Sequence, residues 1–164
     1  MSSGPVHSAA LQASLIDRLN DDDPGTRVEV DRGLSFDDYK RRLVHDLSEL
    51  FNTRRSPPWL DGDYPQVERS LLAYGLPDLT NFNPRNPEDR QNLVRAMERA
   101  VRQFEPRLAR ARIELIEAEG EDATGRDLRF RLDAILRLHP RPVAVSFDTV
   151  LQSVTNQFDV REGG

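Results

Sequence analysis

The spacing of apolar residues changes at Pro106, and this change constrains the fold more than any other feature of the sequence. Before Pro106, apolar side chains recur every three or four positions, which is the period of a helix. After it they alternate with polar ones, as in strands with one buried face. Helices followed by hairpins predict an α+β fold, with N-terminal helices packed on a C-terminal antiparallel sheet of three to four strands.

Three stretches before Pro106 are predicted to be helical. Residues 35–51 begin with the Ser-x-x-Asp spacing of a capping box and carry one apolar face. Residues 86–105 begin with Asn-Pro, which suits an N-cap and a first helical position. A shorter helix is expected over residues 65–74, followed by Gly75 in the left-handed conformation of a C-terminal cap.

The strands are predicted from alternation and from turn residues. The first strand is expected to begin at Ile113, and residues 120–125 have the composition of a hairpin loop. Residues 128–138 alternate most regularly and should form the second strand. A third strand is expected to begin at Val143, and a fourth is expected around residues 158–160.

These elements suggest one folded domain preceded by two less structured segments. Residues 1–13 are small and polar without a periodic pattern, so we expect them to be disordered. Residues 14–34 are interpreted as a docking segment and loop, because Leu15 and Leu19 form a short stripe that ends in an acidic turn. Residues 35–162 are predicted to form a single α+β domain.

The charge of the chain argues against a nucleic-acid-binding protein. The net charge is −5, whereas nucleic-acid-binding domains are usually basic. Arg95, Arg99 and Arg102 share one face of a predicted helix and are the most suggestive feature. However, Glu98 interrupts them and no aromatic residues interleave as stacking platforms. A solvated face or an acidic protein partner is therefore the favoured interpretation.

Motifs for export, membrane insertion and catalysis are missing from the sequence. No apolar run approaches the roughly 20 residues of a membrane span, and no Lys or Arg precedes Arg18 as in a signal peptide. The chain contains no cysteine, and His7, His45 and His139 are far apart. There is no glycine-rich phosphate loop and no nucleophile elbow. We therefore predict a cytoplasmic protein with no catalytic, cofactor-binding or metal-binding residue and no direct insertion into a membrane.

A muramidase-like peptidoglycan hydrolase is the alternative function. Such enzymes need two carboxyl groups about 5–10 Å apart. Glu105 has apolar neighbours in sequence, and Asp133 or Asp148 could supply the second carboxyl group. Arg107 argues against this role, because a nearby guanidinium lowers the pKa of a carboxyl group and makes it a poor general acid.

Four fragments, in order along the chain, together resemble the TssE-type baseplate proteins of bacterial type VI secretion. They are Ser-Leu-Ile-Asp-Arg-Leu at residues 14–19, Asp-Leu-Ser-Glu-Leu-Phe-Asn-Thr-Arg-Arg at 46–55, Tyr-Gly-Leu-Pro-Asp at 74–78 and Phe-Glu-Pro-Arg-Leu at 104–108. His45 and Phe51 stand where that family usually has Arg and Leu. The order and spacing of the fragments fit over nearly the whole chain.

The resemblance implies a non-catalytic structural subunit of a baseplate. It would lie in the cytoplasm, where the baseplate docks to the inner-membrane complex. Its expected partners are the wedge proteins TssF, TssG and TssK and the sheath subunits TssB and TssC. It would join the wedge subunits and template assembly of the contractile sheath, whose strands would add to the edge of the sheet.

The candidate partner-binding residues come from these fragments. They are Leu15, Ile16, Leu19, Arg54, Arg55, Glu105, Pro106 and Arg107. By resemblance, the Glu-Pro-Arg motif is a contact with the wedge core. Two interpretations of this motif stay open: an ion pair that fixes the corner between helix and strand, and a docking point for partner subunits. For Arg54 and Arg55, helix-end capping and solvation is the alternative to a partner contact.

Overall fold

The computed structural model describes most of the predicted domain. The described residues are 35–55, 65–68, 70–116, 127–138 and 141–163. The predicted disordered segment 1–13, the predicted docking segment 14–34 and the predicted hairpin loop 120–125 lie outside them.

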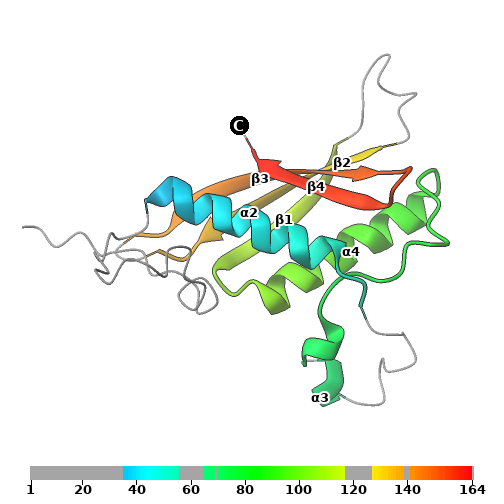
Figure 1. Ribbon diagram of the computed structural model, residues 1–164, viewed down its shortest axis with the longest axis horizontal. Coiled ribbons are helices and arrows are strands. Elements are labelled where there is room, and N and C mark those ends of the chain that lie inside the picture. The colour runs from blue at the N-terminus through cyan, green and yellow to red at the C-terminus, as the bar shows by residue number, and fades with distance from the viewer. Residues whose placement is uncertain (1–34, 56–64, 69, 117–126, 139–140, 164) are drawn as a thin grey trace, which may run out of the picture.

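A four-stranded antiparallel sheet forms the C-terminal half, with the strands in the order β1-β2-β3-β4 (Figure 1). The strands are β1 (Leu108–Ile116), β2 (Leu128–Leu136), β3 (Val143–Gln152) and β4 (Gln157–Glu162). The long helices α2 (Phe36–Asn52) and α4 (Pro87–Phe104) precede the sheet and pack on it, α2 against β4 and α4 against β1. The predicted α+β fold, with N-terminal helices on a C-terminal antiparallel sheet, is confirmed.

Both long helices begin at the predicted capping residues. The side chain of Ser35 accepts a hydrogen bond from the backbone N–H of Asp38 at 3.1 Å. The side chain of Asn86 accepts one from the backbone N–H of Glu88 at 3.0 Å. Each bond satisfies one of the N–H groups that a helix start leaves without an internal partner. No helix in the described part of the chain has the length and apolarity needed to cross a membrane.

The first strand begins five residues earlier than predicted, at Leu108 rather than Ile113. The register of β1 against β2 shifts between Ala109 and Arg112, and Arg110 has a φ of 53°. A bulge of this kind inserts a residue and breaks the alternation of side chains. The period-2 pattern is therefore recognisable only after the bulge.

The prediction of one continuous helix over residues 65–74 is wrong. The structure has a short helix α3 (Pro65–Glu68) and a 3-10 turn η2 (Leu71–Ala73). The hydroxyl of Ser70 donates to the carbonyl of Val67 and accepts from the N–H of Leu72. Serine bonded in this way competes with helical hydrogen bonding and starts a new turn.

The core lies between the two long helices and one face of the sheet. Its most buried large side chains include Leu43, Leu47, Met97, Val101, Phe130, Leu132 and Phe147. The rings of Phe51 in α2 and Phe158 in β4 lie 5.7 Å apart and join a helix to an outer strand. Burial of such side chains contributes about 1.5–3 kcal/mol each and accounts for most of the stabilisation.

The other face of the sheet is polar and carries a row of alternating charges. Glu114 is paired with Arg131 in the strand register, Arg131 with Asp148, and Asp148 with Arg161. We refer to these four residues as the open-face charge row. Arg131 Nε donates to Asp148 Oδ1 at 3.1 Å, and both side chains are close to half exposed.

Candidate partner-binding site

Three of the four fragments that carry the resemblance lie in the described part of the chain, and they meet in space. They occupy residues 46–55, 74–78 and 104–108. The first includes the C-terminal half of α2, the second follows η2, and the third joins α4 to β1. The rings of Tyr74 and Phe104 pack edge to face, with their centroids 5.2 Å apart, and so join the second fragment to the third.

A short parallel bridge joins the end of α2 to the segment after η2. The N–H of Arg55 donates to the carbonyl of Leu76 at 2.8 Å, and the N–H of Leu76 donates to the carbonyl of Thr53 at 2.9 Å. Gly75 has a φ of +102°, and a Cβ there would lie 2.2 Å from the Thr53 oxygen. Only glycine fits both the conformation and the space. The left-handed conformation predicted for Gly75 is confirmed.

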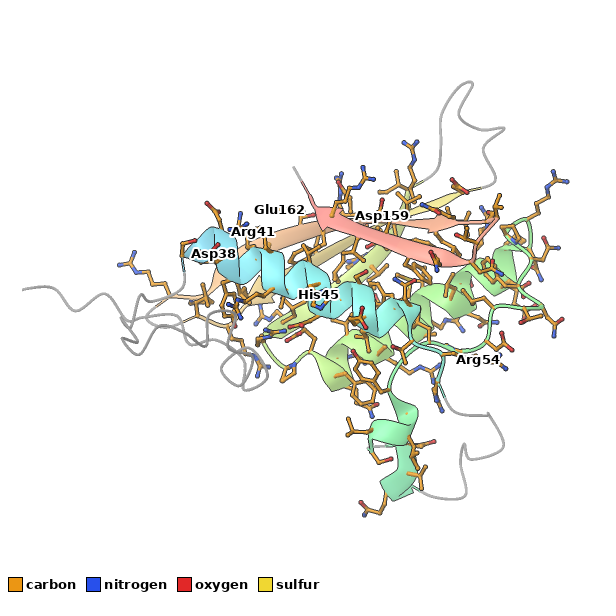
Figure 2. The ribbon with its side chains drawn as sticks, viewed as in Figure 1. Asp38, Arg41, His45, Arg54, Asp159 and Glu162 are labelled. Atoms are coloured by element: carbon orange, nitrogen blue, oxygen red, sulfur yellow. The ribbon has the colours of Figure 1, made fainter. Side chains whose placement is uncertain are left out.

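Arg54 is the residue of this bridge that pairs with Leu76, and its side chain lies on the surface (Figure 2). Its Nη2 is 2.7 Å from Asp78 Oδ2, and its side chain is 72% exposed. Hydrogen bonds from the hydroxyl and the N–H of Thr80, with the charge of Arg54, lower the pKa of Asp78. Arg54 therefore pairs within the chain while most of its guanidinium side chain stays in solvent.

The Glu-Pro-Arg motif forms the corner between α4 and β1. The N–H of Glu105 donates to the carbonyl of Val101 and closes the helix, as the proline at 106 predicts. The Glu105 carboxylate is buried and accepts from Arg107 Nε at 2.6 Å; Arg107 Nη2 binds both Glu105 and Asp46. Because Asp46 lies in α2, these three side chains, the corner triad, tie α2 to the start of the sheet.

The corner triad keeps its arginine charged. Burial acts to lower the pKa of Arg107, but hydrogen bonds and charge interactions with Glu105 and Asp46 outweigh it and raise the pKa above its ordinary value. The guanidinium carbon lies 5.8 Å from the ring centroid of Tyr39, within range of a cation–π contact. A planar guanidinium can hold two carboxylates and an aromatic ring at once, which lysine cannot.

The geometry favours the interpretation of the motif as an ion pair that fixes the corner between helix and strand. The Glu105 side chain is only 6% exposed, and its charge is matched inside the domain. The Arg107 and Asp46 side chains are 23% and 37% exposed, and Pro106 is exposed. A partner could therefore still reach the outer side of the triad, and docking at this motif stays a prediction.

Two residues of this site were not among the sequence candidates. One is Asp46, the third member of the triad. The other is Asn52, whose side-chain amide donates to the Phe158 carbonyl at 2.9 Å and whose oxygen accepts the Phe158 N–H at 2.8 Å. Both lie in the fragment at residues 46–55, which was the available signal. The candidates Leu15, Ile16 and Leu19 lie outside the described residues.

The carboxyl groups considered for a hydrolase are not brought together. Glu105 faces α2 within the corner triad, whereas Asp133 and Asp148 lie on the polar face of the sheet, and Asp148 binds Arg131. Among the described residues, no three His, Cys, Asp or Glu side chains are arranged to hold a metal ion. The arrangement therefore offers ion-pair and surface contacts rather than paired acids across a cleft.

Comparison with known proteins defines the class as baseplate wedge proteins. The family model described as baseplate wedge protein gp25 matches residues 37–141, which run from α2 through β2 and contain all three described fragments. The chain belongs to the baseplate wedge protein gp25 family, and this membership gives it a structural role in a baseplate.

Solved structures and curated proteins add two further findings. The chain is similar to a chain in the solved structure described as "The baseplate complex from the type VI secretion system". The identity is 18%, the similarity covers 71% of this chain and 97% of that chain, and the TM-score is 0.48. A search among curated proteins finds no significant match.

Proposed function

We propose that this chain is a non-catalytic wedge subunit of a type VI secretion baseplate, which joins the other wedge subunits and templates the contractile sheath. The observation that carries the proposal is the match of residues 37–141 to the baseplate wedge family. The three TssE-like fragments are far apart in sequence but meet at one place in the structure. This supports the type VI assignment, because the fragments then contribute to one surface.

The proposed partners are the wedge proteins TssF, TssG and TssK, at a baseplate on the cytoplasmic side of the inner-membrane complex. The corner triad supports a docking role as well as a structural one. Glu105 and Asp46 hold the Arg107 guanidinium in one orientation, so a partner would lose little conformational entropy in binding its outer side. Arg54 and Arg55 follow the C-terminal end of α2, the helix that contains Asp46. Leu15, Ile16 and Leu19 would add contacts from the N-terminal segment.

Co-expression with the three wedge proteins tests the assembly role. We expect the chain to co-purify with them as one complex, and we expect Arg107→Lys to weaken the complex. Lysine keeps the charge but cannot bind two carboxylates in a fork. Failure of the wild-type chain to enter the complex would contradict the proposal, and so would turnover of purified peptidoglycan that Glu105→Gln abolishes.

The outer strands are the proposed site for sheath assembly. Each has one backbone N–H taken by a helix side chain: Glu98 accepts from Ile113 in β1, and Asn52 accepts from Phe158 in β4. Such protection limits unspecific strand pairing while leaving the rest of the edge available for strand addition.

A proline at the β4 edge tests this part of the proposal. The N–H of Glu162 lies four residues after that of Phe158 and points to the same side of the strand, away from β3. Glu162→Pro should therefore stop sheath growth and leave wedge assembly intact, whereas Glu162→Ala, which keeps the backbone N–H, should leave both intact. Normal sheath growth from baseplates with the proline would contradict strand addition at β4.

A further inference from the structure

A groove follows the outward face of α4. The three residues of the corner triad do not line it. It consists of two adjoining hollows of about 210 and 540 Å³ that share Pro77, Ala96 and Arg99. The first hollow extends towards Gly75, and the second extends along α4 to Arg95. We refer to both together as the α4 groove.

The sign of charge in the α4 groove is opposite to that of the whole chain. Among the described residues, the groove is lined by four arginines and two glutamates, whereas the net charge of the protein is −5. The arginines are Arg55, Arg95, Arg99 and Arg102. One of the glutamates, Glu98, already accepts the N–H of Ile113 at 3.0 Å. A local excess of positive charge on an acidic protein favours an acidic ligand.

Apolar surface adjoins this charge. Leu71 and Leu72 are 83% and 54% exposed, and the next residue, Ala73, lines the groove. Figure 1 shows that α3 and the η2 turn project from the body of the molecule beside the C-terminal end of α4. Two successive exposed leucines next to a groove are typical of a surface that a partner covers.

We propose that the α4 groove binds an acidic segment of another baseplate subunit, with its carboxylates on Arg95, Arg99 and Arg102 and an apolar side chain against Leu71 and Leu72. This proposal rests on the proposed function, since it assumes that the chain lies in a baseplate. Arginine is among the side chains that contribute most at protein interfaces, and the exposed leucines offer apolar surface that a partner would remove from water. The groove is open and is lined by polar and apolar surface alike, which suits a peptide segment better than a small molecule.

Site-specific cross-linking identifies the occupant. The chain contains no cysteine, so Arg99→Cys creates a single attachment point for a photoreactive group. The labelled chain is assembled into the baseplate and irradiated, and the cross-linked peptide is sequenced by mass spectrometry. We expect an acidic peptide of a different subunit. Arg161→Cys, on the polar face of the sheet, is the matched control and should not yield the same peptide.

A variant that removes positive charge tests how much the arginines of the α4 groove contribute to binding. Arg95, Arg99 and Arg102 are all exposed, so their triple replacement by alanine should leave the melting temperature nearly unchanged. It should weaken incorporation into the baseplate about tenfold or more, and added salt should weaken the wild type in the same direction. The control carries the same change of charge on the polar face of the sheet, in Arg112→Ala, Arg129→Ala and Arg161→Ala, and should be incorporated normally.

The outcomes separate this proposal from the proposed function. If the wild-type chain enters the baseplate but the labelled Arg99→Cys variant captures nothing, the groove proposal is wrong and the assembly role stands. Capture of this chain's own residues 1–34, of nucleic acid or of a basic peptide also overturns it. If the wild-type chain does not enter the baseplate at all, the proposed function is wrong and the groove proposal falls with it.

Discussion

The two sides of the sheet use the same kind of ion pair in different surroundings. On the helical side, the Glu105 and Arg107 side chains are 6% and 23% exposed and bind each other through two hydrogen bonds. On the polar side, Arg131 and Asp148 are 47% and 44% exposed and share one bond of 3.1 Å. Solvent and salt screen the second pair more strongly than the first. The comparison indicates that burial, rather than the pairing itself, determines how strongly the fold depends on a charge.

The largest effect is expected from breaking the corner triad. Arg107→Ala leaves the buried Glu105 carboxylate without its cation, which should cost about 3–5 kcal/mol of unfolding free energy. The measurement is chemical denaturation monitored by circular dichroism. The double variant Glu105→Gln with Arg107→Met is the control, and it should be more stable than Arg107→Ala because no charge is left buried and unpaired. A loss below about 1 kcal/mol in Arg107→Ala would mean that the pair is energetically a surface pair.

The second effect is steric, and it compares Gly75, next to the end of α2, with Gly163, next to the end of β4. In Gly75→Ala, the new Cβ meets the Thr53 carbonyl oxygen in a backbone conformation with φ of +102°. Left-handed strain and the clash together should cost at least about 2 kcal/mol. Gly163→Ala is the control: its Cβ would approach Ser146 at 2.9 Å, but near the end of the chain and without positive φ. It should cost less than about 1 kcal/mol by the same denaturation assay.

A third variant tests the attachment of β4 to the helical side. Asn52→Ala removes both hydrogen bonds to the backbone of Phe158 and should cost about 1–3 kcal/mol. Hydrogen exchange of the Phe158 amide should accelerate, because its N–H loses its acceptor. Asn92→Ala, at an exposed position of α4, should leave stability unchanged or raise it slightly, since alanine favours helix. Unchanged protection of Phe158 in Asn52→Ala would show that the bond to Asn52 is dispensable.

Local sequence signals predicted the elements far better than their contacts. The capping residues at 35 and 86 and the alternation over residues 128–138 act through neighbours a few positions away, so they can be recognised in one sequence. Arg107 and Asp46 are 61 positions apart, and Asn52 and Phe158 are 106 apart. Nothing local specifies such pairs, because tertiary packing alone brings them together.

The two incorrect predictions have local causes of a different kind. The bulge at Arg110 interrupts the alternation of β1, and the side-chain bonds of Ser70 divide the helix predicted over residues 65–74. In both places one residue adopts a geometry that the average pattern of its neighbours does not indicate. The resemblance was more informative about the site, because its three fragments in the described part of the chain meet in space.

The fourth prediction concerns the open-face charge row. Arg131→Ala removes the residue that lies between Glu114 and Asp148 in the register of the sheet. Because Arg131 and Asp148 are close to half exposed, the expected loss is only about 0–1 kcal/mol, and it should shrink further in about 1 M salt. Thermal melting at low and high salt gives both values. A loss as large as that of Arg107→Ala would remove the distinction between the two sides of the sheet.

The smallest effect is expected from an exposed ion pair on the helical side of the sheet. It tests whether burial, or the side of the sheet on which a pair lies, determines how much the pair stabilises the fold. Asp78 pairs with Arg54 and accepts from Thr80, and these contacts lower its pKa in the folded protein. A carboxylate with a lowered pKa stabilises the fold above its unfolded pKa of about 3.9, and this contribution disappears as the pH falls through the folded value. The difference in melting temperature between wild type and Asp78→Asn should therefore be small at pH 7 and vanish in stronger acid. If the difference is instead large at neutral pH and insensitive to salt, then the helical side strengthens even exposed pairs, and burial is not what separates the two sides.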